Sequence, residues 1–222
     1  MRELADGLWC IDHDFQLMGA HVGLRTTILR LSTGEILLHS PGALSAADVA
    51  DIRALGPVAG VFAPNAMHHM FLNAAHEALG GEIWVSAGLS ERLPQYASCR
   101  AVSDTVPEAW GAGISIERIR GVRMMHEIAL FHAASRTLCL ADFVFNVHHP
   151  ATSWTKFVMW ANAGLGKFGP TRVGKSMFQD KAAIRASLDV ILSWDFDRIT
   201  VCHGDVVESG GHAKLAAVRA AL

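Results

Sequence analysis

Apolar runs and amphipathic stretches alternate along this chain of 222 residues. Runs that are wholly apolar, or that alternate with polar positions, predict strands at residues 8–11, 27–31, 35–39, 58–63, 82–86, 114–119, 127–133, 137–145 and 198–202. Helical spacing, capping residues and glycine stops predict helices at residues 46–55, 68–79, 89–93, 153–163, 180–194 and 214–222. Residues 58–86 read strand, helix, strand, which is the order of a parallel crossover. The pattern therefore predicts an α/β fold.

Composition limits the size and the partners of this fold. Hydrophobic residues make up 51% of the chain, and no linker rich in proline, serine or glycine divides it, so we expect a single domain over residues 1–222. The formal net charge is −2, without a basic stripe or tail, so we expect neither nucleic acid nor a membrane as partner. A small-molecule substrate is the expected ligand, and a homodimer stays open.

The cysteines indicate a reducing compartment. Cys10, Cys99, Cys139 and Cys202 form no C-x-x-C pair, and three of them lie in apolar runs, which is typical of buried thiols. The first residues show no charged-then-apolar signal pattern, and no apolar run approaches the roughly 18 residues of a membrane span. We therefore expect a cytoplasmic protein.

Candidate chemistry is concentrated at the ends of apolar runs. His68 and His69 follow the run at residues 58–63, and His126, Asp142 and His203 stand at or just past the ends of later runs. Such residues can converge on one rim of the sheets, where imidazoles and a carboxylate suit a divalent ion. Each also has a structural alternative: a helix cap or packed ring for the histidine pair, stacking for His126, and a buried acceptor for Asp142.

A second motif has the letters of a phosphate-binding loop. Residues 169–176 match G-x-x-x-x-G-K-[ST], but no buried strand directly precedes them and only 46 residues follow. The context argues against nucleotide binding. Arg172 and Lys175 instead could contact an anionic substrate group, or belong to a solvated loop.

In these residues the chain resembles the metallo-β-lactamase fold superfamily. The resemblance covers the opening hairpin at 24–38, the strand-to-histidine junction at 62–69, His126, the Ala141-Asp142 step and the closing Cys202-His203-Gly204. It implies an αββα sandwich of two mixed β-sheets flanked by helices, with ions at the rim. It also implies cleavage of an ester, amide, thioester or phosphodiester bond by metal-activated water.

The sequence departs from the usual His-x-His-x-Asp-His signature of that superfamily. Asn65-Ala66-Met67-His68-His69 stands there, so His69 matches the last histidine and His68 takes the place of the aspartate. By this resemblance His69, Asp142 and His203, with His68 or His126, would hold one ion rather than two. Zn²⁺ is expected, with iron or manganese as alternatives, and Asp142 and His68 are the candidate catalytic residues.

Two other functions remain open from the sequence. A degenerate member of the fold would lack catalysis and use the cleft to bind a small molecule or a protein. A redox enzyme would use iron, because histidine and carboxylate ligands suit iron as well as zinc.

Overall fold

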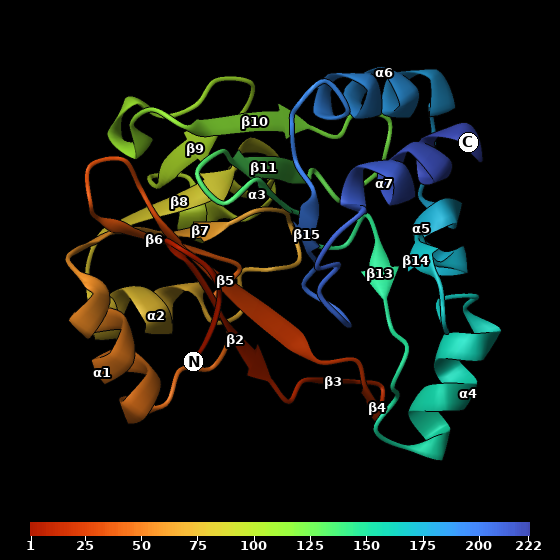
Figure 1. The fold of residues 1–222 in the computed structure, drawn as a ribbon, viewed down its shortest axis with the longest axis horizontal. Helices are drawn as coiled ribbons and strands as arrows, with labels where there is room; N and C mark the ends of the chain where they lie inside the picture. The colour runs from red at the N-terminus through yellow and green to blue at the C-terminus, as the bar shows by residue number, and fades with distance from the viewer.

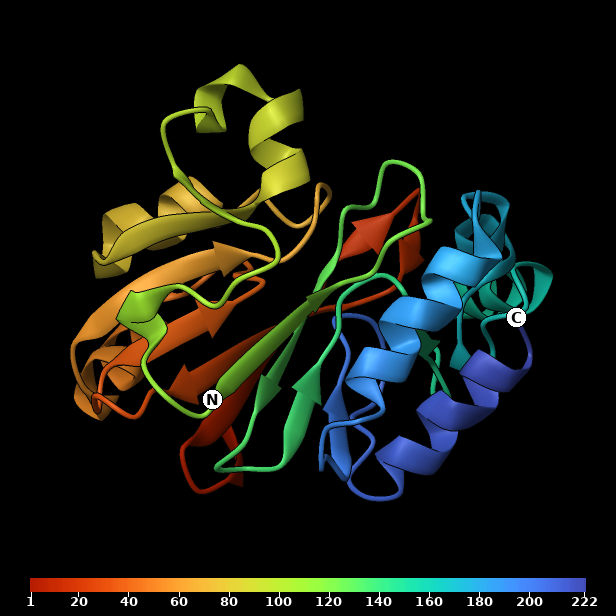
Figure 2. The same ribbon diagram turned by 90° about the horizontal axis from the view of Figure 1, so that it is seen from above.

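The computed structural model describes all residues 1–222 and has four layers. Two sheets face each other in the middle, and helices cover their outer faces (Figure 1, Figure 2). The αββα arrangement with mixed sheets is thereby confirmed. None of the helices combines the length and the apolar character needed to cross a bilayer.

The first sheet has seven strands in the order β1-β2-β5-β6-β7-β8-β9. Their bounds are β1 Arg2–Ala5, β2 Leu8–His13, β5 Leu24–Arg30, β6 Ile36–His39, β7 Val58–Ala63, β8 Glu82–Ser86 and β9 Arg100–Val102. Pairs from β1 to β6 are antiparallel, and pairs from β6 to β9 are parallel. The crossover from β7 through a helix to β8 is parallel, as its sequence order predicts.

The second sheet has four strands in the order β10-β11-β12-β15. Their bounds are β10 Ile114–Arg118, β11 Ile128–His132, β12 Thr137–Cys139 and β15 Arg198–Thr200. Only the pair β12 and β15 is parallel. Since parallel strands end at the same edge, the residues that follow β12 and β15 emerge side by side.

Helices cover the outer faces of both sheets, and two further pairs of short strands lie outside the sheets. The helices are α1 Ala46–Leu55, α2 Leu72–Leu79, α3 Ala87–Arg92, α4 Ser153–Ala161, α5 Arg172–Ser176, α6 Lys181–Ile191 and α7 Gly211–Ala220, with single 3₁₀ turns at Pro94–Tyr96 and Glu108–Trp110. The hairpin of β3 Gln16–Leu17 with β4 Ala20–His21, and the pair of β13 Phe145–Asn146 with β14 Phe168–Gly169, complete the strands.

Three apolar clusters separate the four layers, because successive strand residues point to opposite faces. In β11, Ile128 and Leu130 lie in the cluster between the sheets, whereas Ala129 and Phe131 lie in the cluster under α6 and α7. The first sheet shows the same alternation against α1, α2 and α3. Strands buried on both faces explain why the sequence shows nearly continuous apolar runs.

Two element boundaries near the site differ from the prediction, and one strand was not predicted. The helix expected at 68–79 begins at Leu72, so His68 and His69 lie in the turn before it. The strand expected at 137–145 ends at Cys139, so Asp142 lies in a loop. The irregular stretch at 88–111 contains β9, a three-residue strand too short for periodicity to reveal.

Candidate metal centre

His68, Asp142 and His203 meet where the edges of the two sheets approach each other. Asp142 and His203 each follow the paired residues Cys139 and Thr200 by three positions, so the parallel register brings them together. His68 reaches them from the turn after β7. All three side chains are buried, and one potential ligand atom of each lies within 4.8 Å of the others.

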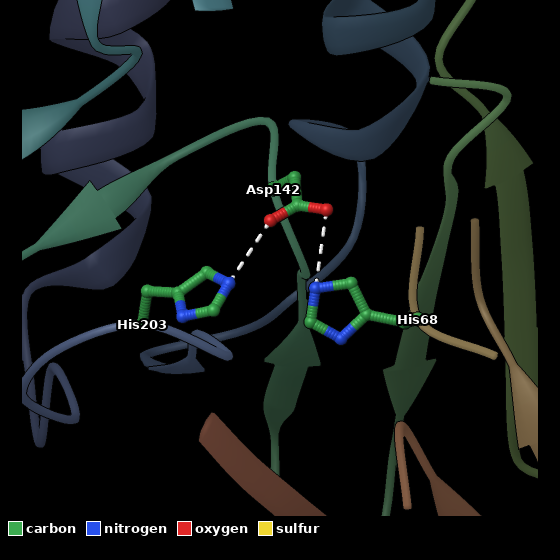
Figure 3. A group of neighbouring side chains, drawn as sticks. All are labelled: His68, Asp142 and His203. Atoms are coloured by element: carbon green, nitrogen blue, oxygen red, sulfur yellow. Dashed lines mark ion pairs between the residues drawn. The ribbon is translucent and has the colours of Figure 1, made fainter. Parts of the chain in front are cut away.

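The carboxylate of Asp142 lies between the two imidazoles, as Figure 3 shows. His68 Nε2 is 3.1 Å from Asp142 Oδ2, and His203 Nε2 is 3.1 Å from Asp142 Oδ1. The ring of Phe145 stacks on the ring of His203, with centroids 4.8 Å apart, and fixes its plane. Each oxygen of the carboxylate therefore faces one ring nitrogen.

The tautomer of His203 shows that this arrangement fits a cation. His203 Nδ1 lies 2.6 Å from the carbonyl oxygen of Gly23, which can only accept, so Nδ1 carries the proton. In a neutral ring Nε2 then directs a lone pair at Asp142 Oδ1. Two facing acceptors require a positive charge between them, either a second proton on the ring or a metal ion.

The orientation of His68 is fixed in a similar way. Its Nδ1 lies 2.6 Å from the hydroxyl of Ser40, a buried residue at the end of β6 with φ of 56°. A non-glycine residue in this left-handed region is strained, and such strain is common beside functional sites. The hydroxyl can accept from Nδ1 and leave Nε2 free to bind a cation.

Asn65 and Glu127 hold Asp142 in place, and neither was singled out as a site residue from the sequence. The side-chain amide of Asn65 donates to Asp142 Oδ2 at 2.8 Å, and its carbonyl accepts from the backbone N–H of His68. Glu127 accepts from the backbone N–H groups of Ala141, Asp142 and Phe143. The sequence signal for Asn65 was its place in the altered signature, and for Glu127 its place beside His126.

Electrostatics at the centre follow from this burial and pairing. Burial alone would raise the pKa of Asp142, but His68 and His203 hold that pKa well below its usual range. Burial would lower the pKa of His68, whereas the Asp142 carboxylate holds it well above its usual value. Burial and the nearby charge of Asp142 raise the pKa of Glu127 to about 7, against the three backbone donors.

His69 and His126 lie outside this group. His69 packs edge-on against Tyr96, whose hydroxyl is 3.4 Å from His69 Nδ1. His126 packs over Gly88 of α3, where even an added Cβ would overlap the imidazole. Metal ligation by either residue stays a prediction, as does ligation by the group of three.

The phosphate-loop pattern lies in a setting that differs from a nucleotide site. The pattern begins at the last residue of β14, a strand of two residues that pairs antiparallel with β13. Thr171 caps the five-residue helix α5 by accepting from Gly174 N–H, and the Arg172 guanidinium donates to the carbonyl of Ala161. A buried parallel strand before the loop, which phosphate binding of this type requires, is not there.

A large pocket opens onto the centre. It has a volume of about 780 Å³, and His68, Asp142 and His203 are part of its wall. Most of the remaining wall is apolar and comes from the β3–β4 hairpin, the turn at residues 67–71, α4 and α5. A ligand in this pocket would contact the candidate metal ligands directly.

Solved structures with a similar fold are metallo-β-lactamases. One is FIM-1 from Pseudomonas aeruginosa in its mono-zinc form, at 12% identity, with 99% of this chain and 94% of that chain covered and a TM-score of 0.63. The enzymes of Pontibacter korlensis, at 10% identity and 98% and 95% coverage, and Erythrobacter litoralis, at 15% identity and 99% and 95% coverage, give TM-scores of 0.67 and 0.66.

Neither a protein-family profile nor a curated sequence matches the chain. The structural likeness extends over almost the whole chain, and its low identity shows the fold alone. The chain therefore has the metallo-β-lactamase fold, and it has a buried His-Asp-His group that could hold a metal ion at the rim of the sheets.

Proposed function

We propose that the protein is a metal-dependent hydrolase in which His68, Asp142 and His203 hold a single divalent ion, with zinc as the expected metal. The observation that carries the proposal is the pair of ring nitrogens that face one buried carboxylate, each on a different oxygen. A bound ion would lower the pKa of water towards neutrality and polarise the scissile carbonyl.

The chain's own residues prepare the centre for that role. The Gly23 carbonyl sets which nitrogen of His203 carries a proton, and the Ser40 hydroxyl orients the ring of His68. The amide of Asn65 holds one oxygen of Asp142. The side chains of His68, Asp142 and His203 are buried, which limits their contact with bulk water and strengthens the electrostatic interactions among them.

Metal content and hydrolysis test the proposal together. Protein purified without added metal should retain close to one zinc per chain, and Asp142→Asn and His203→Ala should lower metal affinity by at least about tenfold. His212→Ala is the matched control, because the exposed ring of His212 donates to the carbonyl of Leu192, outside the group, and its loss should leave metal content unchanged. Equal metal content in Asp142→Asn and the wild type would contradict the proposal.

A non-catalytic binding protein is the second candidate, and the altered signature favours it. Asn65, Ala66 and Met67 stand where the His-x-His-x-Asp-His signature would place ligands, which removes part of the expected donor set. In that case metal-loaded protein would cleave none of a panel of esters, thioesters, amides and phosphodiesters. Iron or manganese in place of zinc would appear in the same elemental analysis.

The location of the protein also stays a proposal. We infer a cytoplasmic protein, supported by its four free cysteines, of which Cys10, Cys139 and Cys202 are buried.

A further inference from the structure

The pocket above the His-Asp-His group gathers most of the chain's methionines. Six of the eight line it: Met18, Met67, Met70, Met125, Met159 and Met177. They come from the β3–β4 hairpin, the turn before α2, the segment before β11, α4 and the end of α5. Residues so far apart in sequence meet only in the folded molecule, so their gathering is a property of this pocket.

Methionine gives a pocket wall an adaptable shape. Its side chain is unbranched, with a polarisable thioether, and it fits ligands that take many conformations. Phe15, Phe71 and Phe157 add aromatic surface to the same wall. The wall offers few partners for hydroxyl or amide groups, so a sugar or a peptide would leave its polar groups unsatisfied there.

The polar side chains of the wall form two groups. His68, Asp142 and His203 lie together at the rim of the sheets. Asn162, Thr171 and Arg172 each make a hydrogen bond to a backbone group of α4 or α5, so the first group is the main polar region for a ligand. A ligand that fits both the apolar wall and the His-Asp-His group has a flexible apolar body and one polar end. The volume of about 780 Å³ lies within the range of roughly 300–1,000 Å³ typical of small-molecule sites.

We propose that this pocket binds a single acyl chain, with the chain against the methionines and its carbonyl end at His68, Asp142 and His203. The substrate class that follows is a fatty acyl ester or thioester. The reaction rests on the proposed hydrolase function, whereas binding of the chain does not.

Calorimetric titration of the purified protein with lauric acid and with butyric acid tests the binding step. Both acids carry the same carboxylate, so they differ only in the apolar chain. Lauric acid should bind more tightly, by up to about fourfold for each added methylene. Absence of lauric acid binding, or equal affinity for the two acids, would overturn the proposal.

Two exposed aromatic residues of α4 form a matched pair of variants. Phe157 lines the pocket and is 53% exposed, whereas Trp160 is 67% exposed and does not line it. Phe157→Ser should weaken lauric acid binding by about tenfold, since it removes buried ligand contact. Trp160→Ser should change it less than about twofold, and equal effects of the two substitutions would count against the pocket.

Hydrolysis of p-nitrophenyl acetate and p-nitrophenyl laurate by zinc-loaded protein separates this inference from the proposed function. Lauric acid binding without cleavage of either ester would support the acyl pocket and contradict the hydrolase. Cleavage of the acetate without lauric acid binding would support the hydrolase and contradict the acyl pocket. Preference for the laurate, lost in Phe157→Ser and kept in Trp160→Ser, is the result expected if both hold.

Discussion

Individual residues at the centre were predictable from the sequence only where position alone decides their role. His68, Asp142 and His203 could be found because each follows an apolar run, and the ends of such runs meet at a rim. The places of Asn65 in the altered signature and of Glu127 beside His126 did not give their role, because that role depends on which way each side chain points. His126 has φ of 51°, and its ring lies over α3 while its neighbour Glu127 faces the site.

Replacement of Glu127 by glutamine tests this positioning role. Glutamine keeps the shape but brings an amide group that faces backbone N–H donors, so we expect a loss of about 1–3 kcal/mol in the free energy of unfolding. Urea denaturation measures it. Glu77→Gln, on the exposed face of α2, should change stability by no more than about 0.5 kcal/mol. Equal effects would show that Glu127 holds nothing in place.

His132 predicts a pH dependence of stability. It is buried in β11, its Nε2 donates to the Arg30 carbonyl, and its Nδ1 meets the Ser135 hydroxyl, so the neutral ring fits the fold. Burial lowers the pKa of His132 below its usual 6.5. Below about pH 6.5 the unfolded chain therefore binds more protons than the folded chain, and the free energy of unfolding falls as the pH falls.

The comparison with His132→Gln isolates this contribution. Stability of the wild type, measured by urea denaturation from pH 7.5 to about 5, should fall more steeply below about pH 6.5 than that of the variant. Above that pH the two slopes should agree. Parallel slopes across the whole range would contradict the assignment to His132.

Elements were predictable where an apolar run or a capping motif marks them in the sequence. β7, β8 and α1 occupy the expected residues, because apolar runs and a capping box mark them. The predicted start of α2, at residue 68, was wrong by four residues. Asn65 accepts from the backbone N–H groups of Met67 and His68 and so holds a turn there, and a side chain that caps a turn leaves no periodic signal.

The cap of α6 gives a test at the scale of one element. The Asp180 side chain accepts from the backbone N–H groups of Ala182 and Ala183, at 2.9 and 3.0 Å. Asp180→Ala should lower the free energy of unfolding by about 1 kcal/mol, read from a shift in the urea midpoint. Asp51→Ala, in the middle of the exposed face of α1, is the control and should have a smaller effect.

The whole molecule was predictable in its layers but not in its pocket. The order of strands and helices predicted an α/β fold, and the resemblance to the metallo-β-lactamase fold implied the sandwich that the structure has. The pocket depends on six methionines that are scattered along the sequence and on a hairpin, β3–β4, too short to predict. The lining of the pocket, and with it the class of ligand, could therefore not be predicted from net charge and composition.

The proposed function requires one ion held by two imidazoles and a carboxylate at the end of this pocket. X-ray absorption at the zinc edge of protein loaded with one equivalent of zinc measures the ligands directly. We predict that only nitrogen and oxygen atoms ligate the zinc and that the spectrum shows the outer-shell scattering of two imidazoles. This spectrum should be lost in Asp142→Asn, because the variant binds zinc more weakly. Sulfur in the first shell, from a methionine or from Cys202, or an unchanged spectrum in Asp142→Asn, would contradict the proposal.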